Sequence, residues 1–142
     1  MDLWQHAAVS ASLSAGLYLA TGDPALAGAF CLSGIFVDLD HVLDYVMEKG
    51  RLDLGDFFDH FGKHRARRLV LVLHAWEWFP LVAALWALSA RPSWLLGLLL
   101  GWLVHLVLDQ IVNPLRLTGY FFFYRAGVRF DARFIGSAAY DS

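Results

Sequence analysis

The chain has 142 residues, of which 58% are hydrophobic and 17% are charged, and its net charge is −2. A typical soluble domain is nearer half apolar and a quarter charged, so this composition favours a membrane protein with room for one domain. The small net charge gives no reason to expect a nucleic-acid partner. The single cysteine, Cys31, excludes an intrachain disulfide and a cysteine-based zinc finger.

Two apolar segments fill the first third of the chain, each close to the ~20 residues that a helix needs to cross a bilayer. The first covers residues 3–20 and ends at the turn 21–24, "TGDP". It has no basic region at its start and no clear cleavage site, which favours a retained span over a signal peptide. The second segment covers residues 25–47.

The third apolar segment covers residues 69–88, and the fourth covers residues 94–112 and stops at Asn113-Pro114. Both are apolar on all sides, which favours membrane helices over the striped helices of a soluble bundle. We therefore predict an all-α integral membrane bundle of four transmembrane helices. It forms a single domain, 1–142, with a polar linker at 48–68 and a C-terminal tail at 113–142.

Basic residues indicate how this bundle is oriented. The turn 21–24 has none, and the turn 90–93 has only Arg91. The linker and the tail carry the others: Lys49, Arg51, Lys63, Arg65, Arg67, Arg68, Arg116, Arg125, Arg129 and Arg133. Because positive residues favour the cytoplasmic side, we expect both termini and the linker to be cytoplasmic.

Ionisable residues within the four segments all fall towards the predicted cytoplasmic ends. They are His6 in the first segment, Asp38, Asp40, His41 and Asp44 in the second, His74 and Glu77 in the third, and His105 and Asp109 in the fourth. One charge deep in a membrane helix costs ~2.5–3.5 kcal/mol, so a group of them needs partners. A divalent cation suits carboxylates and neutral imidazoles, and without thiolates the choice is zinc, iron or manganese.

Helical spacing places these groups on shared faces. The second-segment cluster falls within an arc of ~160° at ~100° per residue, and His105 and Asp109 are i,i+4 neighbours. We predict one or two divalent ions, with zinc as the first expectation, bound by His6, Asp38, Asp40, His41, His74, His105 and Asp109. The surplus carboxylates can instead orient histidine ligands. Further candidates are His60, His64 and Asn113, although for the two histidines the polar linker favours a solvated amphipathic helix.

Three stretches resemble the inner-membrane metal-dependent hydrolase family, a group of small polytopic proteins: "VDLDH" at 37–41, "FGKHR" at 61–65 and "VHLVLDQIVNP" at 104–114. That family shows D-x-D-H, H-R-G-x-T-H-S and S-H-x-x-x-D segments in this order. The resemblance implies functional roles for Asp38, Asp40, His41, His105 and Asp109. The middle stretch departs from the family pattern, because no T-H-S follows His64 and the next histidine, His74, lies five positions too late. H-x-x-x-D spacing is also similar to the metal-binding helices of zinc-dependent phospholipase C.

We predict that the protein hydrolyses a lipid-borne ester, a phosphoester ahead of a carboxylic ester, with metal-activated water at the cytoplasmic interface. Asp44 or Glu77 is the predicted general base, and Arg65, Arg67 and Arg68 are predicted to hold the phosphate. The expected partner is a membrane lipid and not a nucleic acid. The expected location is the cytoplasmic membrane of a bacterium or archaeon.

Two alternatives remain open. His6, His41, His74 and His105 supply one imidazole per segment, which a haem-binding membrane cytochrome would need. Against it, every one of these except His6 has a carboxylate nearby, which haem ligation does not require. The other alternative is a structural or partner-binding membrane protein, in which the polar cluster holds helices together or binds a structural metal.

Overall fold

The computed structural model describes residues 3–63 and 65–136, and within these ranges the regular structure is all helical. Two isolated β-bridges, Arg68–Asp131 and Leu115–Gly136, are the exceptions. The predicted all-α class is therefore confirmed. His64, a further ligand candidate, lies outside the described residues.

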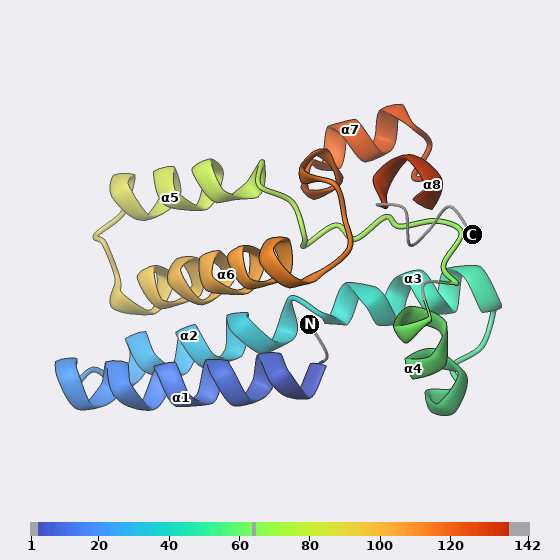
Figure 1. Ribbon diagram of the computed structural model, residues 1–142. Coiled ribbons are helices and arrows are strands. Elements are labelled where there is room, and N and C mark those ends of the chain that lie inside the picture. The colour runs from blue at the N-terminus through green and yellow to red at the C-terminus, as the bar shows by residue number, and fades with distance from the viewer. Residues whose placement is uncertain (1–2, 64, 137–142) are drawn as a thin grey trace.

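The helices run along one long axis, with most of the bundle at one end and the shorter elements at the other (Figure 1). In chain order they are α1 Leu3–Thr21, α2 Pro24–Phe36, α3 Leu39–Lys49, α4 Leu54–Gly62, α5 Trp78–Leu88, α6 Ser93–Val112, the 3₁₀ helix η1 Leu117–Tyr120, α7 Phe122–Gly127 and α8 Ala132–Ile135.

Local sequence signals encode the tight turn between α1 and α2. Gly22 has φ +68°, a left-handed conformation that glycine adopts without steric cost. The Asp23 carboxylate then accepts hydrogen bonds from the backbone N–H groups of Ala25 and Leu26, at 2.9 and 3.0 Å. Pro24 occupies the first helical position, where its missing N–H costs nothing.

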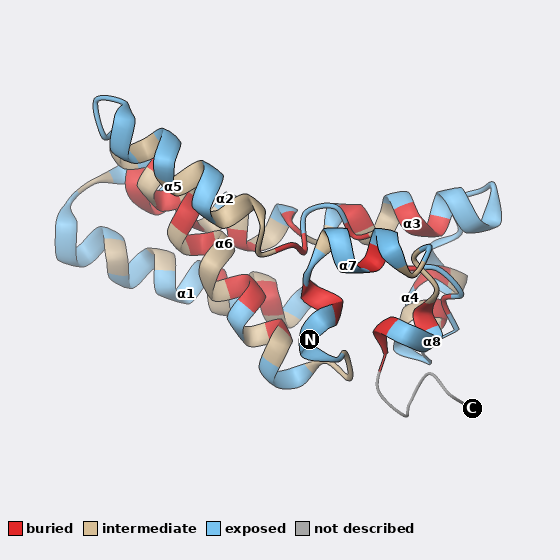
Figure 2. Ribbon diagram, turned by 90° about the horizontal axis from the view of Figure 1, so that it is seen from above, coloured by how far each residue is buried: buried red, intermediate tan, exposed pale blue. Residues whose placement is uncertain are grey.

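The closest helix pair is α2 and α6, and two glycines on α6 permit their approach. A Cβ atom at Gly97 would collide with the Leu26 carbonyl, and one at Gly101 with the Phe30 carbonyl. These glycines form the G-x-x-x-G pattern that lets helix backbones pack closely. The buried residues concentrate along this contact and on the inner side of α3 (Figure 2).

The second predicted segment, 25–47, is divided into two helices. The break lies at Val37 and Asp38, where the Asp38 N–H reaches back only three residues to the Ile35 carbonyl, at 3.4 Å. Such an i→i+3 bond belongs to a tighter helical turn. α3 nevertheless continues onward from α2, away from the start of the bundle (Figure 1).

The predicted third helix, 69–88, begins only at Trp78. Residues 69–77 are extended or turning, and side-chain carboxylates take up several of their N–H groups. Pro80 explains the late start, because it falls in the first turn of α5, where proline is tolerated. A helix from residue 69 would place this ring in its interior and lose a hydrogen bond.

Among the residues that the structure describes, two helical stretches are long and apolar enough to cross a membrane, namely Pro24–Lys49, which joins α2 and α3, and Ser93–Val112. α5 is apolar but has only 11 residues, fewer than the ~20 that a straight crossing needs. Two of the four predicted spans therefore meet the criteria of length and composition in the structure.

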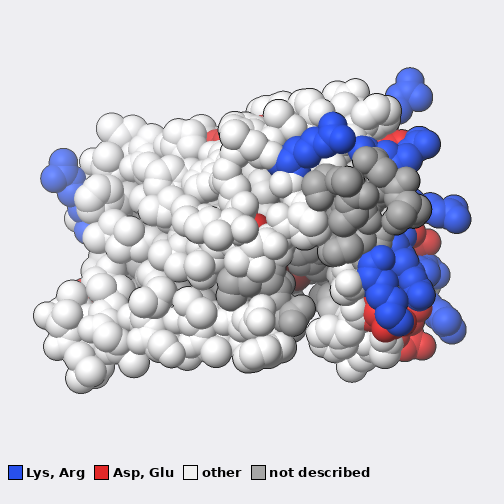
Figure 3. All heavy atoms as spheres, in the orientation of Figure 1, with Lys and Arg blue, Asp and Glu red and all other residues white. Residues whose placement is uncertain are grey.

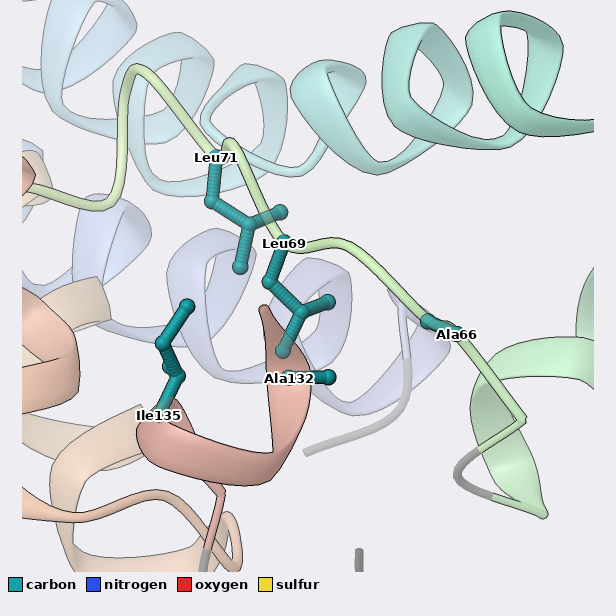
Figure 4. Packing of buried hydrophobic residues seen from close by; sticks show 5 residues of the cluster. All are labelled: Ala66, Leu69, Leu71, Ala132 and Ile135. Carbon is teal, nitrogen blue, oxygen red and sulfur yellow. The ribbon is translucent and has the colours of Figure 1, made fainter. Parts of the chain in front are cut away.

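The predicted linker and tail pack together at one end of the fold. Ala66, Leu69 and Leu71 meet Ala132 and Ile135 in a small buried cluster (Figure 4). The linker also contains α4, and the tail contains η1, α7 and α8. This contact holds the non-helical segment before α5 in place.

Candidate metal centre

The face of α6 that packs on α2 continues directly into the polar site. Its i,i+4 series is Gly97, Gly101, His105 and Asp109. The facing series from α2 is Leu26, Phe30, Gly34 and then Asp38, just past the end of α2. Close packing at the glycines therefore brings the last members of both series together.

Four donor atoms lie near the spacing of tetrahedral ligands over five of their six separations. His74 Nε2 is 3.1 Å from His105 Nε2, 3.2 Å from Asp109 Oδ2 and 3.5 Å from Asp38 Oδ1. His105 Nε2 is 3.4 Å from each of the same two carboxylate oxygens. Metal–ligand bonds of ~2.0–2.1 Å in a tetrahedron separate the ligand atoms by ~3.3–3.4 Å. We call these four side chains the inner centre.

Both histidines of the inner centre are oriented by a partner on the other ring nitrogen. His105 Nδ1 lies 2.9 Å from the Gly34 carbonyl, which can only accept, so Nδ1 carries the proton and donates it. His74 Nδ1 lies 3.0 Å from the Asp40 carboxylate, which also accepts from the Leu73 N–H at 2.8 Å. These contacts leave both Nε2 atoms directed at the centre, the arrangement that metal-binding histidines show in proteins.

His6 supports the centre from α1. Its Nε2 is 2.7 Å from Asp109 Oδ1, and its ring stacks on His105 with 3.9 Å between centroids. Two sets of potential ligand atoms lie within 4.8 Å of one another: His6, Asp38, His105 and Asp109, and also Asp38, His41 and His74. Asp38 belongs to both sets. The structure therefore brings together six of the seven predicted ligands, while Asp40 lies behind His74.

His74 is a titratable member of the inner centre that lies on the non-helical segment before α5. Burial alone would lower its pKa, but the Asp40 charge and hydrogen bonds to Asp109 and Asp38 raise that pKa well above its ordinary value. Protonation of His74 and metal binding therefore compete, because only neutral imidazole ligates metal.

Arg125 is a buried residue whose local role the sequence did not reveal. Its guanidinium donates to the carbonyls of His74 at 2.9 Å, Gly119 at 2.5 Å and Leu71 at 2.6 Å. The side chain is fully buried. Burial lowers its pKa, but a guanidinium titrates so far above neutrality that it stays cationic. Arg125 thus ties α7 to the segment that carries His74.

The two predicted general bases have other partners. Asp44 Oδ2 accepts from the N–H groups of Val70 at 2.7 Å and Leu71 at 3.1 Å. Glu77 Oε1 accepts from the Phe123 N–H at 3.0 Å. Both carboxylates hold backbone segments around the centre, and neither has a recorded contact with its four donor atoms within the described ranges.

The predicted phosphate ligands lie on the surface. Arg65 pairs with Asp59 at 3.6 Å, the Arg67 N–H donates to Glu48 at 3.2 Å, and Arg68 donates to the Arg129 carbonyl at 3.4 Å. All three arginines are exposed, among the basic side chains that gather at one end of the molecule (Figure 3).

Of the further ligand candidates, His60 has its recorded contacts away from the inner centre, and Asn113 follows Asp109 at the end of α6. His60 is buried between Tyr45 and Phe61, with Glu48 at 3.6 Å. Asn113 follows the end of α6, and its N–H bonds to the Asp109 carbonyl at 2.8 Å. Sequence spacing places Asn113 one turn beyond Asp109, but the helix has ended there.

No family model matches the chain, and no curated protein or solved structure is significantly similar to it. The three short motifs therefore remain a resemblance to the inner-membrane metal-dependent hydrolases. Any function has to be argued from the geometry of the centre.

Proposed function

We propose that the protein is a membrane-embedded, metal-dependent hydrolase that cleaves a lipid-borne ester, with a phosphoester as the first choice. The observation that carries the proposal is the inner centre. Four donor atoms from separate parts of the chain lie 3.1–3.5 Å apart over the five separations given above. Both imidazoles are already held in the orientation that ligation requires.

The donor set favours zinc, with iron and manganese as alternatives. Two imidazoles and two carboxylates are nitrogen and oxygen ligands of intermediate softness, and the set has no thiolate. Two aspartates also offset the charge of one divalent ion. This matters because the side chains of His74, His105 and Asp109 are at most 2% exposed, and an unbalanced charge would be costly there.

The surface supports a membrane location, and we propose four membrane segments, α1, α2–α3, α5 and α6, of which the 11-residue α5 is shorter than a straight crossing needs. None of the residues of α5 is buried, and the large apolar side chains of Leu81, Leu85 and Leu88 are exposed. The basic side chains gather at the end with α3, α4 and α8 (Figure 3), while the turn between α5 and α6, which carries Arg91, lies at the opposite end (Figure 1). In this proposal both termini and the linker are cytoplasmic, in the cytoplasmic membrane of a bacterium or archaeon.

Labelling of engineered cysteines tests this topology. In a Cys31→Ala background, Gly50→Cys and Arg91→Cys should react with an impermeant reagent from opposite sides of the membrane. Reaction of both from the same side would contradict the four-span arrangement.

A bound divalent ion would polarise the scissile ester oxygen and lower the pKa of the attacking water. The chain would hold the ligands through Asp40, Gly34 and His6, and would admit substrate at Asp38 and His41. The side chains of these two residues are 10% and 22% exposed, against 3% or less for the others in the cluster. The exposed Arg65, Arg67 and Arg68 would attract an anionic headgroup to this end.

An apolar groove supports a substrate with an acyl chain. It is shallow and open, and is lined by Trp4, Gln5, Ala8, Val9 and Val112. The first four belong to α1 and the last ends α6, so the groove lies along the two helices that carry His6 and Asp109. The proposal assigns no general base, because Asp44 and Glu77 are engaged with backbone N–H groups.

A structural metal site is the second candidate. Four protein donors around one ion form a closed site, which is typical of structural zinc. A haem protein is not favoured by the geometry, because His74 and His105 place their Nε2 atoms 3.1 Å apart, with no room for a porphyrin between them.

The test is hydrolysis of labelled phospholipids and polyprenyl phosphates by purified protein, with and without a chelator. We expect chelator-sensitive turnover that His105→Ala abolishes and His60→Ala, a buried histidine outside the centre, preserves. A folded protein that retains one bound metal and cleaves nothing across the panel would point to the structural site. A folded protein that binds no metal would contradict both.

A further inference from the structure

We propose a second divalent-cation site at the solvent side of the inner centre, formed by His41 and the free carboxylate oxygen of Asp38, so that Asp38 is shared between two ions. This inference rests on the proposed function and adds to it the number of ions and the position open to substrate. It concerns the second of the two ligand sets, Asp38, His41 and His74.

The first step is that the inner centre is complete without His41. His74, His105, Asp109 and Asp38 Oδ1 already supply four donors at tetrahedral spacing. A four-ligand ion has no open position, whereas hydrolytic sites keep one for water or substrate. A hydrolase built on this centre therefore needs a coordination position outside it.

The second step is that two polar atoms next to the centre lack partners. Asp38 Oδ2 and His41 Nδ1 are both buried, and neither has a hydrogen-bond partner among the residues that the structure describes. The other two atoms of these groups, His41 Nε2 and Asp38 Oδ1, are 3.7 Å apart, too long for a hydrogen bond. Unpaired buried polar atoms cost free energy, which a bound cation would offset.

The third step is charge. Asp38, Asp40 and Asp109 place three carboxylates around two imidazoles. The buried Arg125 charge acts on Asp40, and one divalent ion compensates for Asp38 and Asp109. A second cation would therefore leave a net positive charge, which would attract an anionic phosphoester.

The fourth step is position. The His41 ring centroid is 4.9 Å from that of His74, so the two rings are in edge-to-face contact and His41 adjoins the inner centre. Two-metal hydrolytic sites hold their ions ~3.5–4 Å apart. His41 and Asp38 are also the most exposed members of the cluster. The chain supplies few ligands on this side, which leaves coordination positions for water and for a phosphoester oxygen.

Manganese loading of the full-length, metal-stripped protein tests the inference. We expect two Mn²⁺ per chain by elemental analysis and an exchange-coupled pair by electron paramagnetic resonance. His41→Ala should bind one Mn²⁺ with an uncoupled spectrum. His60→Ala, the matched control, should keep two coupled ions.

Three outcomes separate this inference from the proposed function. Wild-type protein with one uncoupled ion would overturn the second site and leave the inner centre intact. Two coupled ions in a folded His41→Ala variant would overturn the assignment to His41. No bound ion in folded wild-type protein would contradict the proposed function itself. Should His41→Ala fail to fold, the wild-type spectrum decides alone, since a coupled pair supports the second site and an isolated ion overturns it.

Discussion

His105 and His74 present the same atom to the same centre, but they reach it in different ways. His105 lies on the long helix α6, and its place follows from glycine packing against α2. His74 lies on a non-helical segment, which Asp44, Asp40 and Arg125 hold through backbone hydrogen bonds. Regular packing thus fixes one half of the centre, and long-range polar contacts fix the other. The variants below affect one half at a time.

The largest effect is expected from Arg125→Gln, on the His74 half. The change removes a buried cation and leaves three carbonyls short of donors. We expect a loss of about 3 kcal/mol of stability and a clear fall in metal affinity. Thermal unfolding in detergent and metal titration measure both, with the surface variant Arg133→Ala as the control. Unchanged melting and metal binding would show that Arg125 does not hold this segment.

Gly101→Ala tests the His105 half. The added Cβ meets the Phe30 carbonyl and the Ser33 side chain, so α2 and α6 must separate. We expect a loss of about 2 kcal/mol and weaker metal binding. Gly16→Ala is the matched control, because a Cβ there meets nothing within 4 Å. Equal melting temperatures for the two variants would contradict the close packing of α2 and α6.

Asp40→Asn is expected to act mainly on the metal. Asp40 orients His74 through Nδ1, and loss of such a partner lowers metal affinity by roughly 10–100-fold. Asp44→Asn is the comparison, because Asp44 holds the same segment without touching either histidine of the inner centre. We expect Asp44→Asn to lower stability more than affinity. The same loss of metal affinity in both variants would mean that Asp40 acts only by holding the backbone segment and does not orient His74.

The smallest effect is expected from Arg65→Ala. Arg65 makes an exposed ion pair with Asp59, and such pairs contribute about 0–1 kcal/mol. Melting temperature and metal content should stay unchanged, while turnover of an anionic lipid should slow. A large fall in metal content would place Arg65 in the centre, contrary to the structure.

The helical half of the site could be predicted from sequence, because i,i+4 spacing is a local property. His105 and Asp109 share a face wherever α6 forms, and the series Gly97, Gly101, His105, Asp109 can be read from the sequence directly. Asp38 and His41 follow the same logic on the second segment. Convergence at one level was also predicted, and the inner centre brings these residues together with His74.

The other half could not be predicted, because it depends on contacts between distant residues. Asp40 and Asp44 look like further ligands or bases in sequence, yet they bond the N–H groups of Leu73 and Val70, 33 and 26 positions away. In the sequence, Arg125 counts only as one of the basic residues that indicate membrane orientation. Its carbonyl partners, which include those of His74 and Leu71, come together only when the tail folds. Pro80 is the one local sequence feature that indicates the late start of α5, because proline is tolerated only in the first turn of a helix.

X-ray absorption at the zinc edge tests the central claim most directly, because it counts imidazole ligands. For purified protein loaded with one zinc per chain, in the inner centre, we predict two imidazoles and additional oxygen ligands, with one imidazole remaining in each of His74→Ala and His105→Ala. A zinc spectrum with two imidazoles in wild type that neither variant alters would contradict the inner centre.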